Sequence, residues 1–171
     1  MKIILIGYMG SGKTYIGQLL SLITKYLFYD LDKLISIKYK MSINKIYKIY
    51  GDNKLRIFEK INLKKILFNN YLNYYILSVG GGTPCNYNNI KLMNKFIITI
   101  YLKTYEIILY KRLLKDNKKR PIIYYLPKKK LFNFIKKHIK IRKNNYFKSK
   151  YIINTNYMNF IDIANYIKYA V

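Results

Sequence analysis

Near the amino terminus the chain reads Gly7-Tyr8-Met9-Gly10-Ser11-Gly12-Lys13-Thr14, which fits the phosphate-loop pattern G-x-x-x-x-G-K-[ST]. A short β-branched run, Lys2–Ile6, precedes this stretch, and apolar residues at helical spacing follow it. The glycines allow the backbone to curl so that N–H groups converge on phosphate oxygens, and the start of a helix adds partial positive charge. In such a loop Lys13 reaches the β- and γ-phosphates, and the hydroxyl of Thr14 is a Mg²⁺ ligand. The stretch therefore predicts binding of a nucleoside triphosphate.

The order of the predicted elements outside this loop indicates an α/β domain. Short apolar runs predict five strands, at Lys2–Ile6, Tyr26–Tyr29, Tyr75–Val79, Phe96–Leu102 and Tyr151–Ile153. Helices are predicted after Gly12, from Asn86, and over Leu31–Tyr39, Ile43–Tyr50, Asp52–Phe68, Thr104–Lys115, Lys128–Asn145 and Met158–Tyr169. Strands that alternate with helices imply right-handed crossovers and a parallel sheet covered on both faces. We expect residues 1–171 to form one three-layer α/β/α domain around a five-stranded parallel sheet.

Length and composition exclude several classes of protein. The 171 residues suit one domain, and the 51% apolar content with 17% aromatic residues is too high for a disordered polycation. The apolar runs are far shorter than the ~20 residues of a membrane-spanning helix, and the first of them is too short for a secretory signal. The single Cys85 excludes an internal disulfide, and together with the single His138 it leaves little for a metal site. We expect a cytoplasmic protein or one of an organelle matrix.

The net charge of the chain is extreme, with 33 basic and 7 acidic residues and a formal value of +26. Such a balance can indicate nucleic acid or an anionic membrane surface as a partner. Composition offers another cause, since Ile, Lys, Tyr and Asn, all spelled by AT-rich codons, dominate the chain, whereas Arg occurs four times and Trp never. Drift of a genome toward A and T converts surface Arg to Lys. The charge is therefore weak support for such a partner.

Glycines and acids gather after the predicted strands. Six of the eight glycines lie in the phosphate loop and in Gly80-Gly81-Gly82, and Asp30-Leu31-Asp32 follows another strand. Ligands of an open parallel sheet bind in the crevice beyond the carboxyl ends of its strands, so these groups are expected to share one crevice. There one of the two acids, Asp30 or Asp32, is placed to approach Mg²⁺ and the other a substrate hydroxyl. The alternatives are a loose turn at the glycines and plain N-capping of a helix by Asp30.

The scarce arginines are informative because lysine is everywhere. Arg56 and Glu59 are spaced i, i+3 on a predicted helix, so they can pair. Such a pair is either an ordinary surface ion pair or a device that holds a guanidinium fork for a planar anion. Arg142 lies on the late basic helix. Arg120-Pro121 lies in the irregular stretch 116–127, where we expect a lid over the nucleotide phosphates.

Over essentially its whole length the chain resembles the shikimate kinase family. The matching features are the phosphate loop Gly7–Thr14, the Asp-x-Asp at Asp30-Leu31-Asp32, the spacing from Gly51 through Arg56 to Glu59, the triple glycine Gly80–Gly82, the lid arginine Arg120-Pro121, and the late arginine Arg142 followed by Tyr146. The resemblance implies a five-stranded parallel sheet like that of the nucleoside monophosphate kinases. It also implies phosphorylation of the 3-hydroxyl of shikimate by MgATP, a step of aromatic amino acid biosynthesis.

The resemblance further implies a role for each matching residue. Those expected to contact ATP are Gly10, Ser11, Gly12, Lys13, Thr14, Tyr15 and Arg120. Those expected to contact shikimate are Asp32, Arg56, Gly80, Gly81, Gly82 and Arg142, with the two arginines on the carboxylate and Glu59 holding Arg56. Lys13, Asp32 and Arg120 are the expected catalytic residues, and Asp32 orients or deprotonates the attacking hydroxyl. Thr14 and Asp30 are expected to hold Mg²⁺, the one cofactor.

The chain departs from the family at several positions. Tyr15 replaces a second hydroxylic residue that is common after the loop lysine, and Asn144 replaces a usual proline. Tyr47 and Leu55 stand where the family usually places phenylalanines at the carboxylate end of the pocket, and Leu55 thins that wall. Arg112 is left open between a place near the adenine and an ordinary surface role.

Two alternative functions stay open from sequence alone. One is another small-molecule kinase of the same fold, acting on gluconate or a nucleoside monophosphate. The combination of Asp30, Asp32, Arg56 and the triple glycine argues against it. The other is a basic RNA-binding protein that retains the kinase fold, supported by the charge and by basic stretches of the late helix. We expect instead a monomer whose partners are ATP and shikimate, with no membrane or nucleic acid partner.

Overall fold

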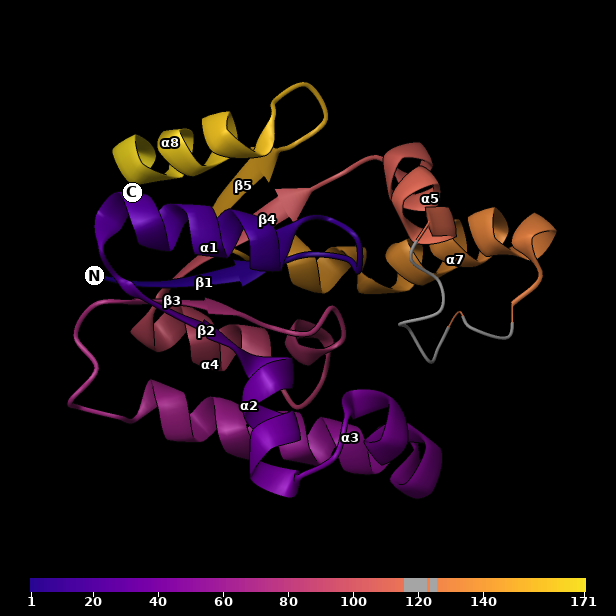
Figure 1. Ribbon diagram of the computed structural model, residues 1–171, viewed down its shortest axis with the longest axis horizontal. Helices are drawn as coiled ribbons and strands as arrows, with labels where there is room; N and C mark the ends of the chain where they lie inside the picture. Colours follow the sequence, from indigo (N-terminus) through magenta and orange to yellow (C-terminus); the bar gives the residue numbers. More distant parts are fainter. Residues whose placement is uncertain (116–122, 124–125) are drawn as a thin grey trace.

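Five parallel strands form the centre of the molecule (Figure 1). The computed structural model describes residues 1–115, 123 and 126–171. The strand order is β2-β3-β1-β4-β5, and each neighbouring pair runs parallel. The strands are β1 (Lys2–Ile6), β2 (Leu27–Asp30), β3 (Tyr75–Ser78), β4 (Ile98–Lys103) and β5 (Tyr151–Asn154). The predicted α/β/α class and the five-stranded parallel sheet are therefore confirmed.

Helices cover both faces of this sheet (Figure 1). They are α1 (Lys13–Thr24), α2 (Leu31–Tyr39), α3 (Ile43–Leu67), the short 3₁₀ turn η1 (Thr83–Cys85), α4 (Asn89–Phe96), α5 (Glu106–Lys115), α7 (Lys128–Tyr146) and α8 (Phe160–Ala170). On one face, α1 and α8 pack together over Ile3 and Leu5 of β1. On the other face, Ile4 and Ile6 belong to a larger cluster that joins residues of α2, α3, α4, α5 and α7.

Strand β1 lies in the middle of the sheet, which explains why its sequence is a continuous apolar run. Ile3–Ile6 are fully buried, because successive side chains of a strand point to opposite faces and both faces are covered by helices. Each fully buried aliphatic side chain contributes about 1.5–3 kcal/mol relative to an exposed one. The strand that precedes the phosphate loop is thus held rigidly in the middle of the sheet.

Several helix and strand boundaries lie a few residues from the predicted ones. The break predicted at Gly51 is present, because Gly51 has the non-helical values φ +73° and ψ 178° and α3 consists of two helical stretches that meet there at a kink. The strand predicted from Phe96 begins at Ile98, because Phe96 ends α4 and the N–H of Ile97 donates to the Met93 carbonyl oxygen at 2.9 Å. The helix predicted from Asn86 begins at Asn89, after η1.

The register of the central strands places three chain segments at one edge of the sheet. Ser78 at the end of β3 pairs with Leu5 of β1 and with Asp30 of β2. The loop after β1, the turn into α2 and the glycines after β3 therefore start side by side. The expected crevice at the carboxyl ends of the strands lies at this edge.

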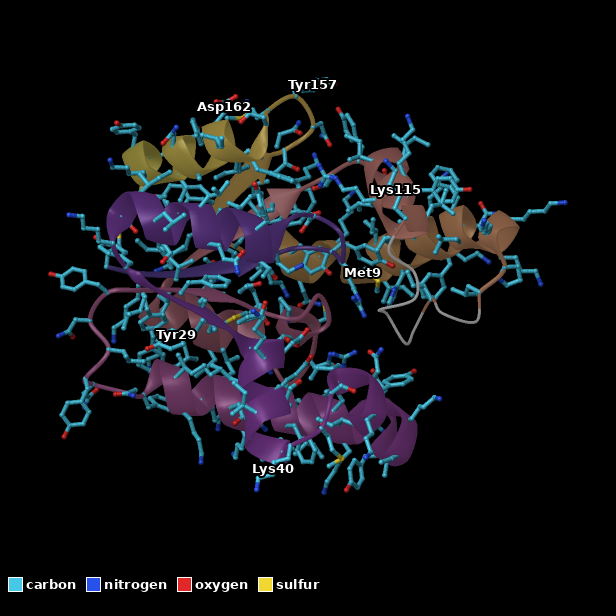
Figure 2. The ribbon with its side chains drawn as sticks, in the orientation of Figure 1. Met9, Tyr29, Lys40, Lys115, Tyr157 and Asp162 are labelled. Carbon is cyan, nitrogen blue, oxygen red and sulfur yellow. The ribbon has the colours of Figure 1, made fainter. Side chains whose placement is uncertain are left out.

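The predicted lid, 116–127, falls largely outside the described residues, which lack 116–122 and 124–125 and hence Arg120 and Pro121. The lid stays a prediction. Among the helices that the structure describes, none has the length and apolarity of a bilayer-spanning segment. Charged and phenolic side chains such as those of Lys40 and Tyr157 extend outward from the surface of the molecule (Figure 2).

Candidate functional site

The phosphate loop connects β1 to α1. Gly12, the residue before α1, has φ +91°, a left-handed conformation that residues with a side chain rarely adopt. The Lys13 ammonium group is buried and donates to the carbonyl oxygens of Gly7 and Tyr8, both at 2.9 Å. The loop therefore presents a positive charge and the positive end of the α1 dipole to the same space.

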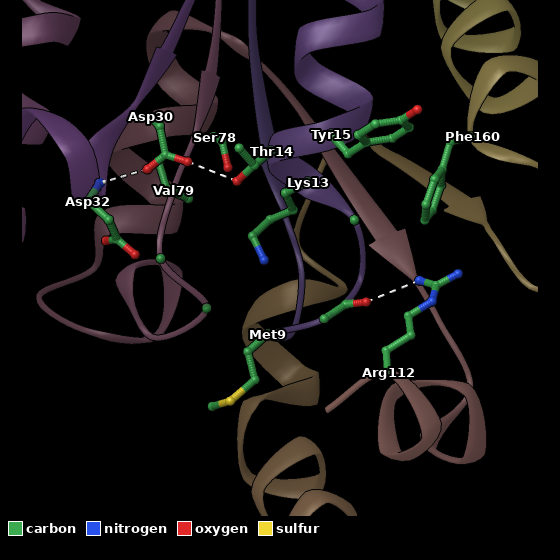
Figure 3. Close-up of a pocket in the computed structure, with 14 residues that line it drawn as sticks. Met9, Lys13, Thr14, Tyr15, Asp30, Asp32, Ser78, Val79, Arg112 and Phe160 are labelled. Atoms are coloured by element: carbon green, nitrogen blue, oxygen red, sulfur yellow. Dashed lines mark hydrogen bonds between the residues drawn. The ribbon is translucent and has the colours of Figure 1, made fainter. Parts of the chain in front are cut away.

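A hydroxyl and a carboxylate meet beside this loop. Thr14 Oγ1 donates to Asp30 Oδ2 at 2.8 Å, while Asp30 Oδ1 accepts from the backbone N–H groups of Asp32 at 3.0 Å and Lys33 at 3.3 Å (Figure 3). Asp30 thus caps α2, which was the alternative considered for it, and also faces the cavity at the loop. Mg²⁺ prefers oxygen ligands and usually takes one or two from the protein and the rest from phosphates and water. The two side chains fit such an ion.

Asp32 lies one residue into α2 and points toward the same space as Lys13 (Figure 3). Burial, together with the negative charges of Glu59 and Asp30, raises the pKa of the Asp32 carboxyl from 3.8 to about 7. Lys13 and Arg56 oppose this rise. The carboxyl group is thus a stronger proton acceptor than an exposed aspartate.

Arg56 of α3 is held by two carboxylates. Its Nη1 donates to Glu59 Oε1 at 2.8 Å, its Nη2 donates to Asp52 Oδ1 at 2.7 Å, and its Nε lies 3.4 Å from Asp52 Oδ2. Arg56 and Glu59 are both buried, whereas the side chain of Asp52 is 49% exposed. Burial raises the pKa of Glu59, although the ion pair with Arg56 opposes this. The pair is therefore an internal one and not the surface ion pair considered from sequence.

Arg142 of α7 is also buried. Its guanidinium carbon lies 5.8 Å from the centre of the Tyr8 ring, within the range of a cation–π contact. One turn later on α7, the Tyr146 hydroxyl donates to the Gly81 carbonyl oxygen at 2.6 Å. This hydrogen bond fixes the end of α7, and with it Arg142, against the triple glycine.

The triple glycine lies among the acidic and basic groups of the site. A methyl group at any of its three positions would press on a different functional side chain. The Cβ would lie 3.2 Å from Asp32 Oδ1 at Gly80, 3.3 Å from Arg142 Nη1 at Gly81, and 2.5 Å from Arg56 Nη1 at Gly82. Consecutive Cα atoms are only about 3.8 Å apart, so the three glycines form a short stretch of backbone. An acid and two arginines from three helices therefore lie close to one small part of the chain.

A cavity of about 310 Å³ lies beside these groups. Its lining includes the predicted site residues Gly10, Gly12, Lys13, Thr14, Tyr15, Asp30, Asp32, Gly80 and Gly81. Three predicted site residues are not among the lining residues: Arg56, Gly82 and Arg142. They lie at the border of the cavity, where Arg56 is close to Gly82 and Arg142 is close to Gly81. Ser11, within the loop, is fully buried. Arg120 lies outside the described residues.

The opposite end of the cavity holds Arg112, whose place near the adenine was left open from sequence, and Phe160, which the sequence did not single out. Arg112 of α5 donates from Nη1 to the Gly10 carbonyl oxygen at 3.0 Å, and its guanidinium carbon lies 4.9 Å from the centre of the Phe160 ring. The ring of Phe160 in turn lies 5.2 Å from that of Tyr15. Arg112 is therefore not an ordinary surface arginine. Its rarity was the only sequence signal, and Phe160 had none.

Comparisons with known proteins agree with this geometry. The family model described as shikimate kinase matches residues 9–170. A shikimate kinase of Flavobacterium psychrophilum is 39% identical over 153 residues, which are 89% of this chain and 88% of that protein. The crystal structure of shikimate kinase from Bacteroides thetaiotaomicron has a TM-score of 0.90 at 26% identity and covers 99% of this chain and 97% of that one. Shikimate kinase from Acinetobacter baumannii in complex with shikimate has a TM-score of 0.89 at 27% identity, covering 99% and 91%.

Proposed function

The chain belongs to the shikimate kinase family and transfers a phosphoryl group from ATP to the 3-hydroxyl of shikimate, and we propose that the side chains around the triple glycine carry out this transfer. One observation carries this assignment of residues. Asp32, Arg142 and Arg56 crowd a single backbone segment next to the phosphate loop, so that a Cβ at Gly80, Gly81 or Gly82 would lie 3.2, 3.3 or 2.5 Å from one of them. A small polyol with one carboxylate needs this combination of an anion clamp and a hydroxyl acceptor.

Arg56 and Arg142 grip the carboxylate of shikimate in this proposal. Two guanidinium groups can bind a planar carboxylate through several charge-assisted hydrogen bonds, which fix its orientation as well as its position. Glu59 holds Arg56 from behind through the 2.8 Å bond, so the fork loses little side-chain freedom when the substrate binds. The neighbouring glycines bring backbone close to the ring of the substrate.

Asp32 receives the proton of the attacking 3-hydroxyl or orients that hydroxyl. Its position supports this role, because it lies between the arginine side of the site and the ammonium group of Lys13. A positioned carboxylate within hydrogen-bond reach of the reacting hydroxyl contributes typically about 10²–10⁴-fold to the rate. Lys13 lies on the ATP side of the transfer, where negative charge develops on the transferred phosphoryl group.

ATP occupies the cavity beside the loop, with its phosphates on the backbone N–H groups there. The residues proposed to contact it are Gly10, Ser11, Gly12, Lys13, Thr14 and Tyr15. Arg112 and Phe160 form a cation–aromatic pair at the far end of this cavity, and we assign the base of the nucleotide to that end. A contact of Arg120 with the phosphates stays a prediction.

Thr14 and Asp30 are the proposed holders of Mg²⁺, since their oxygens lie 2.8 Å apart at the entrance of α1. When bound, the ion neutralises phosphate charge during the transfer. Among the residues that the structure describes, no group of three or more His, Cys, Asp or Glu side chains is placed to hold a metal by itself. The site therefore suits an ion that arrives with the nucleotide.

The proposal is tested by ADP release from purified protein with shikimate, gluconate or a nucleoside monophosphate as acceptor. We expect turnover with shikimate alone, and Arg142→Leu raises KM for shikimate while Lys137→Leu, an exposed change on the same helix, has no effect. Turnover with gluconate or a nucleotide in place of shikimate would overturn the proposal. RNA binding that weakens steeply with added salt, without kinase turnover, would favour the RNA-binding alternative instead. A monomeric state and a cytoplasmic location also stay predictions.

A further inference from the structure

The one histidine of the sequence lies on α7, one turn before Arg142. Its Nδ1 lies 3.0 Å from the hydroxyl oxygen of Tyr8 in the phosphate loop, and the two rings meet edge to face with centroids 5.6 Å apart. Phe134, one turn earlier on α7, contacts the imidazole of His138 on a second side, with ring centroids 4.9 Å apart. The imidazole is thus held in one orientation by two aromatic neighbours and a hydrogen bond.

Tyr8 joins three parts of the site through three different groups. Its carbonyl oxygen accepts from Lys13 Nζ at 2.9 Å. Its ring lies beneath the guanidinium group of Arg142 at 5.8 Å, and its hydroxyl is bonded to His138. The side chain is 2% exposed, so it has little room to move independently. The nucleotide side and the substrate side of the site therefore meet at this one residue.

The charge state of His138 suits a place beside the arginines. Burial, together with the positive charges of Arg142 and Arg56, lowers the pKa of His138 to about 4, and Asp52 opposes this. The imidazole is neutral near pH 7, which spares Arg142 a second positive charge at close range. In a neutral imidazole with its proton on Nε2, Nδ1 can accept a hydrogen bond from the Tyr8 hydroxyl.

We propose that His138 is a positioning residue for shikimate binding, because it fixes through Tyr8 the ring against which Arg142 lies and so connects the carboxylate clamp to the phosphate loop. This inference rests on the proposed role of Arg142 as a grip for the substrate carboxylate. An arginine side chain has several rotatable bonds, and every rotamer that is excluded before binding lowers the entropic cost of binding. Loss of the Tyr8–His138 hydrogen bond frees the Tyr8 ring and with it Arg142.

The test compares His138→Leu, which removes the hydrogen bond, with His138→Asn, whose amide occupies the place of Nδ1. Because a neutral hydrogen bond contributes about 0.5–1.5 kcal/mol, we expect His138→Leu to raise KM for shikimate about two- to twelvefold at unchanged kcat. His138→Asn restores most of the affinity. Tyr8→Phe gives a similar rise, and the double variant Tyr8→Phe/His138→Leu is no worse than either single one. Lys137→Leu, exposed on the same helix, is the matched control.

A merely structural histidine would give a different pattern. If His138→Leu only lowers the folded fraction, apparent kcat falls and KM stays the same, which would overturn the inference. Nuclear magnetic resonance adds an independent measure, since a chain with one histidine gives one set of imidazole ¹⁵N signals. We expect saturation with shikimate to shift these signals, and unchanged signals would also overturn the inference.

Arg142→Leu separates this inference from the proposed function. A large rise in KM for Arg142→Leu together with no change for His138→Leu removes the positioning role and leaves the clamp intact. No rise in either variant contradicts the clamp itself. A rise in both, with non-additive effects of Tyr8→Phe and His138→Leu, is the result that we expect.

Discussion

The two halves of the site are built in different ways. On the nucleotide side, one continuous stretch from Gly7 to Thr14 supplies backbone N–H groups and a single ammonium group. On the substrate side, Asp32, Arg56 and Arg142 come from three different helices, α2, α3 and the distant α7. They meet only because the backbone of Gly80–Gly82 leaves room for all of them.

This difference follows from what each half is proposed to bind. Phosphate oxygens are recognised by any correctly curled backbone at a helix start, so a short local motif suffices. A carboxylate and a set of hydroxyl groups need charged side chains of both signs at fixed places, and burying such charges is costly unless they are paired. The substrate half therefore depends on tertiary packing and on ion pairs, and substitutions there are expected to act on substrate affinity more selectively.

The largest effect is expected at Asp32, the proposed acceptor of the hydroxyl proton. Asp32→Asn keeps the shape of the side chain but removes its ability to accept a proton, so we expect kcat to fall by about 10²–10⁴-fold. KM for ATP changes little, because the phosphate loop is intact. Lys33→Ala, the exposed neighbour, is the control. Near-normal turnover of Asp32→Asn would show that Asp32 is not the acceptor.

The same variant also tests the electrostatic strain of the substrate half in protein free of Mg²⁺ and nucleotide. The Asp32 pKa of about 7 in the folded protein exceeds the ordinary value of 3.8, so ionised Asp32 destabilises the fold. The gain in free energy of unfolding from Asp32→Asn is thus absent below about pH 4, grows up to about pH 7, and is constant above that. Thermal unfolding in EDTA at several pH values measures it. A gain that does not depend on pH over this interval contradicts the raised pKa.

The nucleotide half is tested at its one ammonium group. Lys13→Ala removes the charge that faces the developing negative charge on the phosphoryl group, and we expect kcat to fall on the order of a hundredfold or more. Shikimate affinity in the absence of nucleotide, measured by calorimetry, is expected to stay near its normal value. Lys91→Ala, on the exposed surface of α4, is the control for a change of net charge. If Lys13→Ala weakened shikimate binding by as large a factor as it lowered kcat, the two halves would not act independently.

The contrast between a local phosphate loop and a substrate half built by tertiary packing explains how much of the fold and the site could be predicted from sequence. The α/β class, the five strands and the phosphate loop follow from local periodicity and one contiguous motif. Asp30 was left open between a helix cap and a metal ligand, and the structure shows that one carboxylate oxygen caps α2 while the other faces Thr14. Local sequence cannot show that one carboxylate caps a helix and also faces a hydroxyl from another element.

The substrate half could be predicted only in part. Its residue types were recognised from the family pattern, but their contacts depend on how α3 and α7 meet η1. Asp52 was overlooked as a second partner of Arg56, although its i, i+4 spacing on a helix was a usable signal. The contacts Tyr8–His138 and Arg112–Phe160 join segments far apart in the chain, so no local sequence pattern predicts them.

Gly82→Ala probes the packing of the substrate half without removing any charge. The added methyl group would lie 2.5 Å from Arg56 Nη1, so the guanidinium group must move away from its present place. We expect KM for shikimate to rise roughly tenfold, about 1.4 kcal/mol, with KM for ATP unchanged. Combined with Arg56→Leu, the substitution is expected to add nothing further, because there is no guanidinium group left to displace. Additive losses would mean that Gly82 acts through the backbone instead.

The two carboxylates that hold Arg56 differ in burial, and this difference sets the smallest effects. Glu59 is 3% exposed and Asp52 is 49% exposed, although both bond to the same guanidinium group at 2.8 and 2.7 Å. An exposed ion pair contributes only about 0–1 kcal/mol, so Asp52→Asn is expected to change KM for shikimate by no more than about fivefold. Glu59→Gln leaves a buried guanidinium group without its internal counter-charge, so it costs more in both affinity and stability. Salt distinguishes the two pairs: raising ionic strength screens the Asp52 pair and reproduces part of the Asp52→Asn effect, whereas the Glu59 pair is unaffected. If Asp52→Asn costs as much as Glu59→Gln, then hydrogen-bond geometry outweighs burial in fixing Arg56.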